Sequence, residues 1–113
     1  MAILTDTIVI AGRDEKTRTH LRLVAMGIPD AFIIGEAADL DGLSALARGL
    51  EPDLIVLTAD FGDPAGLDTA LELKAANIDV KILVVSAFGQ PEFVLVVDSD
   101  GIETLVFDDD EDE

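Results

Sequence analysis

The chain has 113 residues, half of them apolar, which is the size and apolar content of one domain with a single core. It contains no cysteine and one histidine, His20, which excludes disulfides, thiolate metal sites and sites built from several histidines. The net charge is −17, so like-charge repulsion disfavours direct binding to a nucleic-acid backbone or an anionic membrane surface.

The acidic charge is partly concentrated at the C-terminus, where residues 108–113 are all acidic. We expect residues 1–107 to form one domain and this tail to be disordered, because a run of like charges buries nothing. The charge has two interpretations: solubility or adaptation to a salty cytoplasm, and attraction to a basic protein partner. No apolar run is long enough for a membrane span, and the N-terminus lacks the basic flank of a signal peptide, so we expect a cytoplasmic protein.

Apolar runs and amphipathic segments alternate along the chain. Runs of branched apolar residues predict strands over 7–11, 31–37, 54–57, 81–85 and 101–107. Apolar residues at helical spacing predict a first helix that ends near Gly27, a second over 42–50 and a third over 66–76. Asp14 is the expected N-cap of the first helix, and His20 is expected to be exposed on it. This alternation predicts an α/β fold with a doubly wound, five-stranded parallel sheet of flavodoxin-like order.

Residues 91–98 favour two different structures. Their β-branched and aromatic composition is typical of a strand. Pro91 and Glu92, however, suit the first turn of a helix, and a parallel sheet needs a crossover at this point.

The third predicted strand ends at a polar residue, Thr58, followed by a loop that contains Gly62, Pro64 and Gly66. Sites in open α/β sheets form beyond the carboxyl ends of the strands, so Thr58 marks the place of a candidate site. The sequence offers no nucleophile–base pair there, which predicts that the chain is not an enzyme. The first strand is followed by a single glycine, Gly12, so a nucleotide or small-ligand cleft is the weakest functional alternative.

Several segments, taken together and in order, resemble the receiver domain of bacterial response regulators, of the class with a helix-turn-helix output domain. They are residues 8–11 with Arg18, 35–39, 52–57, 66–67, and 85–87 followed by 91–95. The resemblance implies a fourth helix over Pro91–Asp98, so we predict a helix there. It also implies a fifth helix at the end of the fold, but the acidic tail takes the place of that helix.

The resemblance breaks at the positions that carry the family's chemistry. A working receiver has a phosphoryl-accepting aspartate after the third strand, and here that position is Thr58. The acidic pair that binds magnesium becomes Gly12 and Arg13, and the lysine that contacts the phosphoryl group becomes Asp108. The hydroxyl position that senses phosphorylation is retained as Ser86. The resemblance therefore implies a degenerate pseudo-receiver that needs no metal or other cofactor.

Nearby acidic residues leave an alternative open. Asp14, Glu15 and Asp60 could form a shifted metal site, although capping of a helix by Asp14 and solvation of a loop by Asp60 explain the same residues. Arg13 could also pair with Asp60 and neutralise the cleft without a metal.

The absence of a final helix predicts an uncovered flank of the sheet around Val9, Leu105 and Phe107. The expected interaction surface consists of Phe93, Leu95, Val96, Leu105 and Phe107. The leading hypothesis is a phosphorylation-independent signalling module that binds a protein partner or forms a homodimer through this surface. The alternative is a receiver-like fragment of a larger transcription factor or assembly ATPase that serves in localisation or regulation.

Overall fold

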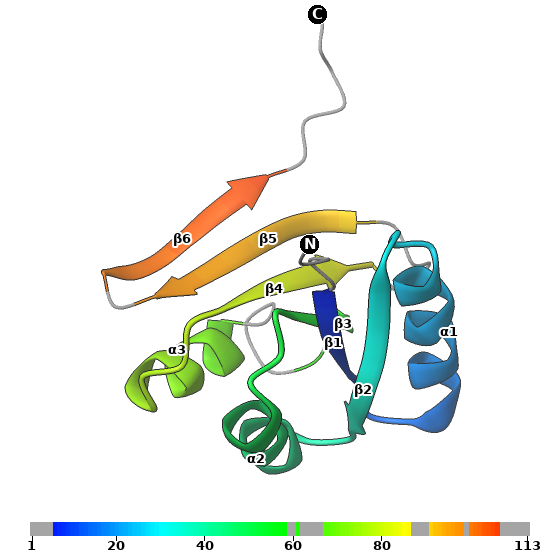
Figure 1. Cartoon of the computed structure of the whole chain (residues 1–113), viewed down its shortest axis with the longest axis horizontal. Helices are drawn as coiled ribbons and strands as arrows, with labels where there is room; N and C mark the ends of the chain where they lie inside the picture. The colour runs from blue at the N-terminus through cyan, green and yellow to red at the C-terminus, as the bar shows by residue number, and fades with distance from the viewer. Residues whose placement is uncertain (1–5, 59–60, 62–66, 87–90, 99, 107–113) are drawn as a thin grey trace, which may run out of the picture.

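The fold is known from a computed structural model that describes residues 6–58, 61, 67–86, 91–98 and 100–106 (Figure 1). The elements are β1 (Asp6–Ala11), α1 (Glu15–Met26), β2 (Ala31–Ala37), α2 (Leu40–Leu50), β3 (Leu54–Thr58), α3 (Leu67–Ala75), β4 (Val80–Val85), β5 (Pro91–Asp98) and β6 (Gly101–Val106).

A single sheet organises the chain, with the strand order β2-β1-β3-β4-β5-β6. The first four strands are parallel, in the flavodoxin-like order that the sequence predicts. The prediction of a five-stranded, all-parallel sheet is wrong, because β5 is an additional strand between β4 and β6. The described sheet has six strands, and β5 runs antiparallel to both β4 and β6.

The predicted helix over Pro91–Asp98 is a strand, β5. Only five residues, 86–90, connect β4 to β5. A parallel return needs a crossover of a dozen or more residues, whereas a short connection favours an antiparallel partner. Pro91 is the first residue of the strand, which is where a missing N–H costs least.

A two-residue connection then joins β5 to β6, so that Asp98 pairs with Gly101. The Asp98 carboxylate accepts a hydrogen bond of 2.8 Å from the Asp100 N–H. Gly101 has a φ of +143°, a conformation that favours glycine, so the glycine suits this turn. β6 matches the predicted strand over 101–107 as far as Val106, and residues 107–113 lie outside the described part of the chain.

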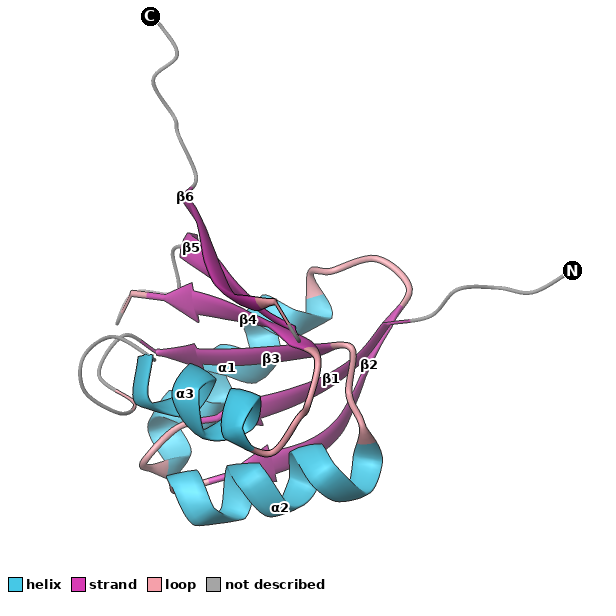
Figure 2. Cartoon of the chain, turned by 90° about the vertical axis from the view of Figure 1, so that its left-hand side faces the viewer, coloured by secondary structure: helices cyan, strands magenta, loops and turns pink. Residues whose placement is uncertain are grey.

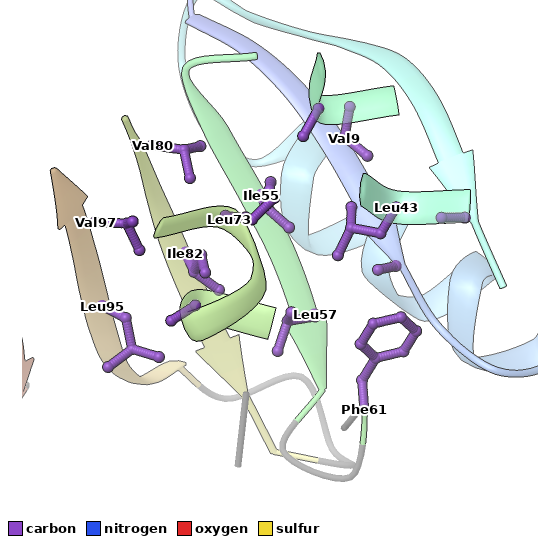
Figure 3. Close-up of a cluster of buried hydrophobic side chains, with 14 of the residues drawn as sticks. Val9, Leu43, Ile55, Leu57, Phe61, Leu73, Val80, Ile82, Leu95 and Val97 are labelled. Atoms are coloured by element: carbon purple, nitrogen blue, oxygen red, sulfur yellow. The ribbon is translucent and has the colours of Figure 1, made fainter. Parts of the chain in front are cut away.

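Three helices are present in the described residues, α1 on one face of the sheet and α2 with α3 on the other (Figure 2). Strand β1 shows why its run is apolar throughout. Val9 and Ala11 pack in the cluster with α2 and α3, while Ile8 and Ile10 pack in the cluster with α1. Full burial of a valine or isoleucine side chain contributes about 1.5–3 kcal/mol. Figure 3 shows the α2–α3 cluster, in which Leu95 and Val97 of β5 take part.

Polar side chains fix the ends of the elements. Asp14 is the N-cap of α1, as predicted, and accepts a 2.8 Å hydrogen bond from the Thr17 N–H. At the amino edge of the sheet, Asp53 accepts a 2.9 Å hydrogen bond from the Thr7 N–H, which holds β1 beside β3.

His20 is exposed on α1, also as predicted. Within the residues that the structure describes, no helix is long and apolar enough to cross a membrane.

Candidate functional site

Three of the predicted site positions lie at the carboxyl ends of adjacent parallel strands. Gly12 directly follows β1, Thr58 is the last residue of β3, and Ser86 directly follows β4. Thr58 pairs in register with Val85, and its side chain is 6% exposed. The strand order therefore brings the three positions to one edge of the sheet. Asp108 lies outside the described residues.

A backbone hydrogen bond links Thr58 to Phe61. The Phe61 N–H donates a 2.9 Å hydrogen bond to the Thr58 carbonyl oxygen, and the Phe61 ring is buried in the α2–α3 cluster (Figure 3). The threonine is thus held between a strand and an anchored turn. Its hydroxyl is not ionised at neutral pH, in contrast to the carboxylate that accepts phosphoryl in working receivers.

The space beside Gly12 is filled by α1. A Cβ at position 12 would lie 2.9 Å from Thr17 Cγ2, closer than real Cβ atoms approach, and 3.2 Å from Arg18 Cγ, which is a tight contact. Arg18 Nη1 also donates a 2.8 Å hydrogen bond to the Gly12 carbonyl oxygen. The sequence analysis identified Gly12 as a degenerate position but did not predict that the side chains of Thr17 and Arg18 pack against it. The only sequence feature that pointed to this contact was the place of both residues near the start of the predicted helix.

Arg18 and Arg22 both face Glu36 at the end of β2. Arg22 Nη2 donates a 3.1 Å hydrogen bond to Glu36 Oε1, and Arg18 Nε lies 3.7 Å from the same oxygen. The hydrogen bond from Arg22 lowers the pKa of the Glu36 carboxyl, against a smaller opposing effect of desolvation. The same bond raises the pKa of Arg22. The sequence analysis did not identify this partner for either arginine.

Two other acidic residues, Asp14 and Asp39, which follow β1 and β2, cap the helices α1 and α2. The hydrogen bond from Thr17 lowers the pKa of the Asp14 carboxyl, and Asp39 accepts a 2.7 Å hydrogen bond from the Gly42 N–H as the N-cap of α2. Asp60, the third residue of the predicted shifted metal site and the predicted partner of Arg13, lies outside the described residues.

The residues at the family's magnesium positions do not fit a divalent cation. Gly12 carries no ligand, a side chain at this position would require Thr17 to shift, and Arg13 is exposed and positively charged. Among the residues that the structure describes, no cluster of three or more His, Asp or Glu side chains is arranged to hold a metal ion.

Some residues of the predicted interaction surface are buried and not exposed. Leu95 is 4% exposed and belongs to the core, because alternate residues of β5 point to opposite faces of the sheet. Phe93 packs against that same cluster, and Val96 is half-buried. The backbone of Leu105 lies in β6, and Phe107 is outside the described residues. The predicted exposure around Val9 is also wrong, since Val9 is fully buried.

A hollow of about 440 Å³ lies between the C-terminal ends of α2 and α3. Its lining residues are Ala47, Arg48, Glu51, Ala76, Asn77, Ile78 and Asp79. It lies at the amino edge of the parallel strands, opposite Thr58, and not at the edge where the small-ligand alternative places its cleft.

Comparison with known proteins agrees with this geometry. The nitrate/nitrite response regulator NarL of Escherichia coli K12 is 28% identical over 103 residues, which are 91% of this chain and 48% of NarL. A LuxR-family two-component response regulator from Aurantimonas sp. SI85-9A1 has a TM-score of 0.63 at 22% identity, covering 74% of this chain and 59% of that one.

The isolated receiver domain of RcsB from Salmonella enterica serovar Typhimurium, in the presence of the phosphomimetic BeF3−, has a TM-score of 0.61 at 17% identity. That match covers 74% of this chain and 62% of the RcsB chain. No family model matches the chain.

The chain thus has the α/β fold of a response-regulator receiver domain, with altered last strands. In sequence it is related to regulators of the NarL type, and it spans about half the length of the curated relatives that it matches.

Proposed function

We propose that this chain is a pseudo-receiver: a receiver-fold module that works through protein–protein contacts and independently of aspartyl phosphorylation. The observation that carries the proposal is the contact between α1 and Gly12, where a Cβ in place of the family's first metal ligand would lie 2.9 Å from Thr17 Cγ2. Thr58 in place of the acceptor and Arg13 in place of the second ligand support it.

The charges at the carboxyl end of β1 also support the proposal. Phosphoryl transfer to a carboxylate depends on a cation that neutralises the phosphoryl oxygens. With Gly12 and Arg13, the positions of two carboxylates carry a net positive charge, and a divalent cation is repelled. In the proposal the chain is not an enzyme, requires no cofactor, and acts in the cytoplasm.

The partner class follows from the surface charge. A net charge of −17 disfavours direct contact with nucleic acid or an anionic membrane and favours a protein partner, including a second copy where the local charge permits. In this proposal the chain acts in signalling or regulation through contacts with such a protein partner.

The proposal is tested by titrating the ¹⁵N-labelled chain with magnesium and then with beryllium fluoride. We expect no saturable shifts at the amides of Gly12, Thr58 and Ser86. The RcsB receiver domain, whose structure was obtained with BeF3−, is the positive control for the reagent. Saturable shifts at these three amides that require both magnesium and beryllium fluoride would overturn the proposal.

A further inference from the structure

Exposed apolar side chains gather around the β2 edge of the molecule. Among the described residues, six large apolar side chains are exposed: Leu23, Met26, Phe32, Ile34, Leu50 and Leu71. Five of them lie on α1, β2 and α2, and only Leu71 lies on α3. The exposed apolar surface is thus concentrated on β2 and its two flanking helices.

Strand β2 is an edge strand, with β1 as its only neighbour in the described sheet. Figure 1 shows β2 and β6 at opposite edges. Natural edge strands are usually protected by lysine, proline, unpaired charges or β-bulges. β2 has no lysine or proline, and its single charge, Glu36, is neutralised by Arg22 and Arg18. Its register against β1 shifts between Ile33 and Gly35, so a bulge at Ile34 is the one of these features that β2 carries. The β2 edge is therefore weakly protected against pairing with another strand.

The apolar residues flank this edge on both sides. A Cβ at Gly35 would lie 3.4 Å from Leu50 Cδ1, so the Leu50 side chain lies over β2. Phe32, which is 64% exposed, shares that face, because Phe32 and Gly35 pair with alternate residues of β1. On the other face Arg22 reaches β2, and Met26 is one helical turn further along the same side of α1.

The charge around this edge differs sharply from that of the whole chain. α1 carries one acidic and three basic residues, β2 one acidic residue, and α2 one of each. The three elements therefore have a net charge of +1, and residues 13–51, which include the acidic residues between them, have a net charge of −2, whereas the chain has −17. Two copies that approach through these elements meet less of the repulsion that opposes contact elsewhere.

We propose that two copies of this chain associate through β2, with the two strands antiparallel about a two-fold axis and the Phe32 side chains within the contact. An antiparallel pair of identical edges satisfies the outward N–H and C=O groups of both strands and closes after two subunits. The opposite edge is a poorer choice, because β6 carries Glu103 and residues 108–113 of the same chain are all acidic. This inference supplies a surface for the self-association in the proposed function.

Sedimentation velocity of the full chain over a wide concentration range tests the proposal. We expect a reversible monomer–dimer equilibrium. Phe32→Lys should weaken dimerisation by at least about tenfold, because it places two like charges in the contact and removes two aromatic anchors. Leu71→Lys is the matched control: it replaces an exposed apolar residue, 52% exposed, away from β2 and should leave the dimer unchanged.

The absence of cysteine allows a second, independent readout. Ile34→Cys should give a dimer with a short bismaleimide crosslinker, and Leu71→Cys should not. The proposal would be overturned by a monomer at every concentration, by equal effects of the two lysine variants on dimerisation, or by equal crosslinking of the two cysteine variants. It would also be overturned if β2 paired with an added extended peptide but not with a second copy of the chain. None of these outcomes depends on magnesium or beryllium fluoride, so failure here is distinct from failure of the pseudo-receiver proposal.

Discussion

The Thr17 methyl group fills the space beside Gly12, so that a Cβ at position 12 would lie 2.9 Å from Thr17 Cγ2. This contact joins the first turn of α1 to the end of β1 and crowds the position that the resemblance to receivers assigns to a carboxylate. An acidic residue in place of Gly12 would therefore have to displace the Thr17 side chain.

The first prediction concerns this contact. Gly12→Ala should destabilise the fold by about 1–3 kcal/mol, the usual cost of overpacking. Adding Thr17→Ala should recover most of the loss, because it removes the clashing methyl group. Urea unfolding of the two single variants and the double variant measures the coupling.

Gly49→Ala is the control for the first prediction, because nothing lies within 4 Å of a Cβ at Gly49 in α2. It should be neutral or stabilise the chain by up to about 1 kcal/mol through helix propensity. Additive effects of Gly12→Ala and Thr17→Ala would show that the contact is not restrictive.

The second prediction concerns the strand assignment of β5. Leu95→Ala should cost about 2–5 kcal/mol, because Leu95 is buried in the α2–α3 cluster. Val96→Ala, at the next and half-buried position, should cost clearly less. Chemical denaturation of both variants measures the difference. Equal losses would argue against the alternation of a strand.

The third prediction is a pH dependence at Glu36. The pKa of its carboxyl is lowered in the folded chain by the hydrogen bond from Arg22, so the charged pair stabilises the fold above the ordinary pKa of 4.5. That contribution is lost as the pH falls through the lowered pKa. Glu36→Gln should therefore lower the Tm by a few degrees at most at pH 7, and the difference from the wild type should vanish in acid.

The control for this prediction is Glu103→Gln, which removes the same charge from an exposed position on β6. It should leave the Tm at pH 7 unchanged or raise it, because it reduces the net negative charge. If the two variants had the same pH profile, the Arg22–Glu36 pair would have no specific role.

The sequence predicted the parallel half of the sheet and its helices because branched apolar runs such as 54–57 suit strands buried on both faces. It also predicted the N-cap at Asp14. It failed at Pro91–Asp98, where the resemblance to a family outweighed a strand-like composition. The decisive feature is the short connection before Pro91, which leaves no room for a crossover.

The sequence predicted where the candidate site lies in the fold, but not which side chains contact one another there. The ends of β1, β3 and β4 placed Gly12, Thr58 and Ser86 at one edge of the sheet. That Thr17 closes position 12 depends on how α1 packs, which periodicity alone does not reveal. The exposure of Phe32 depends likewise on β2 being an edge strand, a property of strand order and not of the local sequence.

The most direct test of the central claim is intact-mass measurement after incubation with magnesium and a small-molecule phosphoryl donor. The pseudo-receiver proposal predicts an unchanged mass for the full chain, under conditions in which an active receiver domain gains one phosphoryl group. An acid-stable or acid-labile gain of one phosphoryl group on this chain, abolished by removing magnesium, would contradict it.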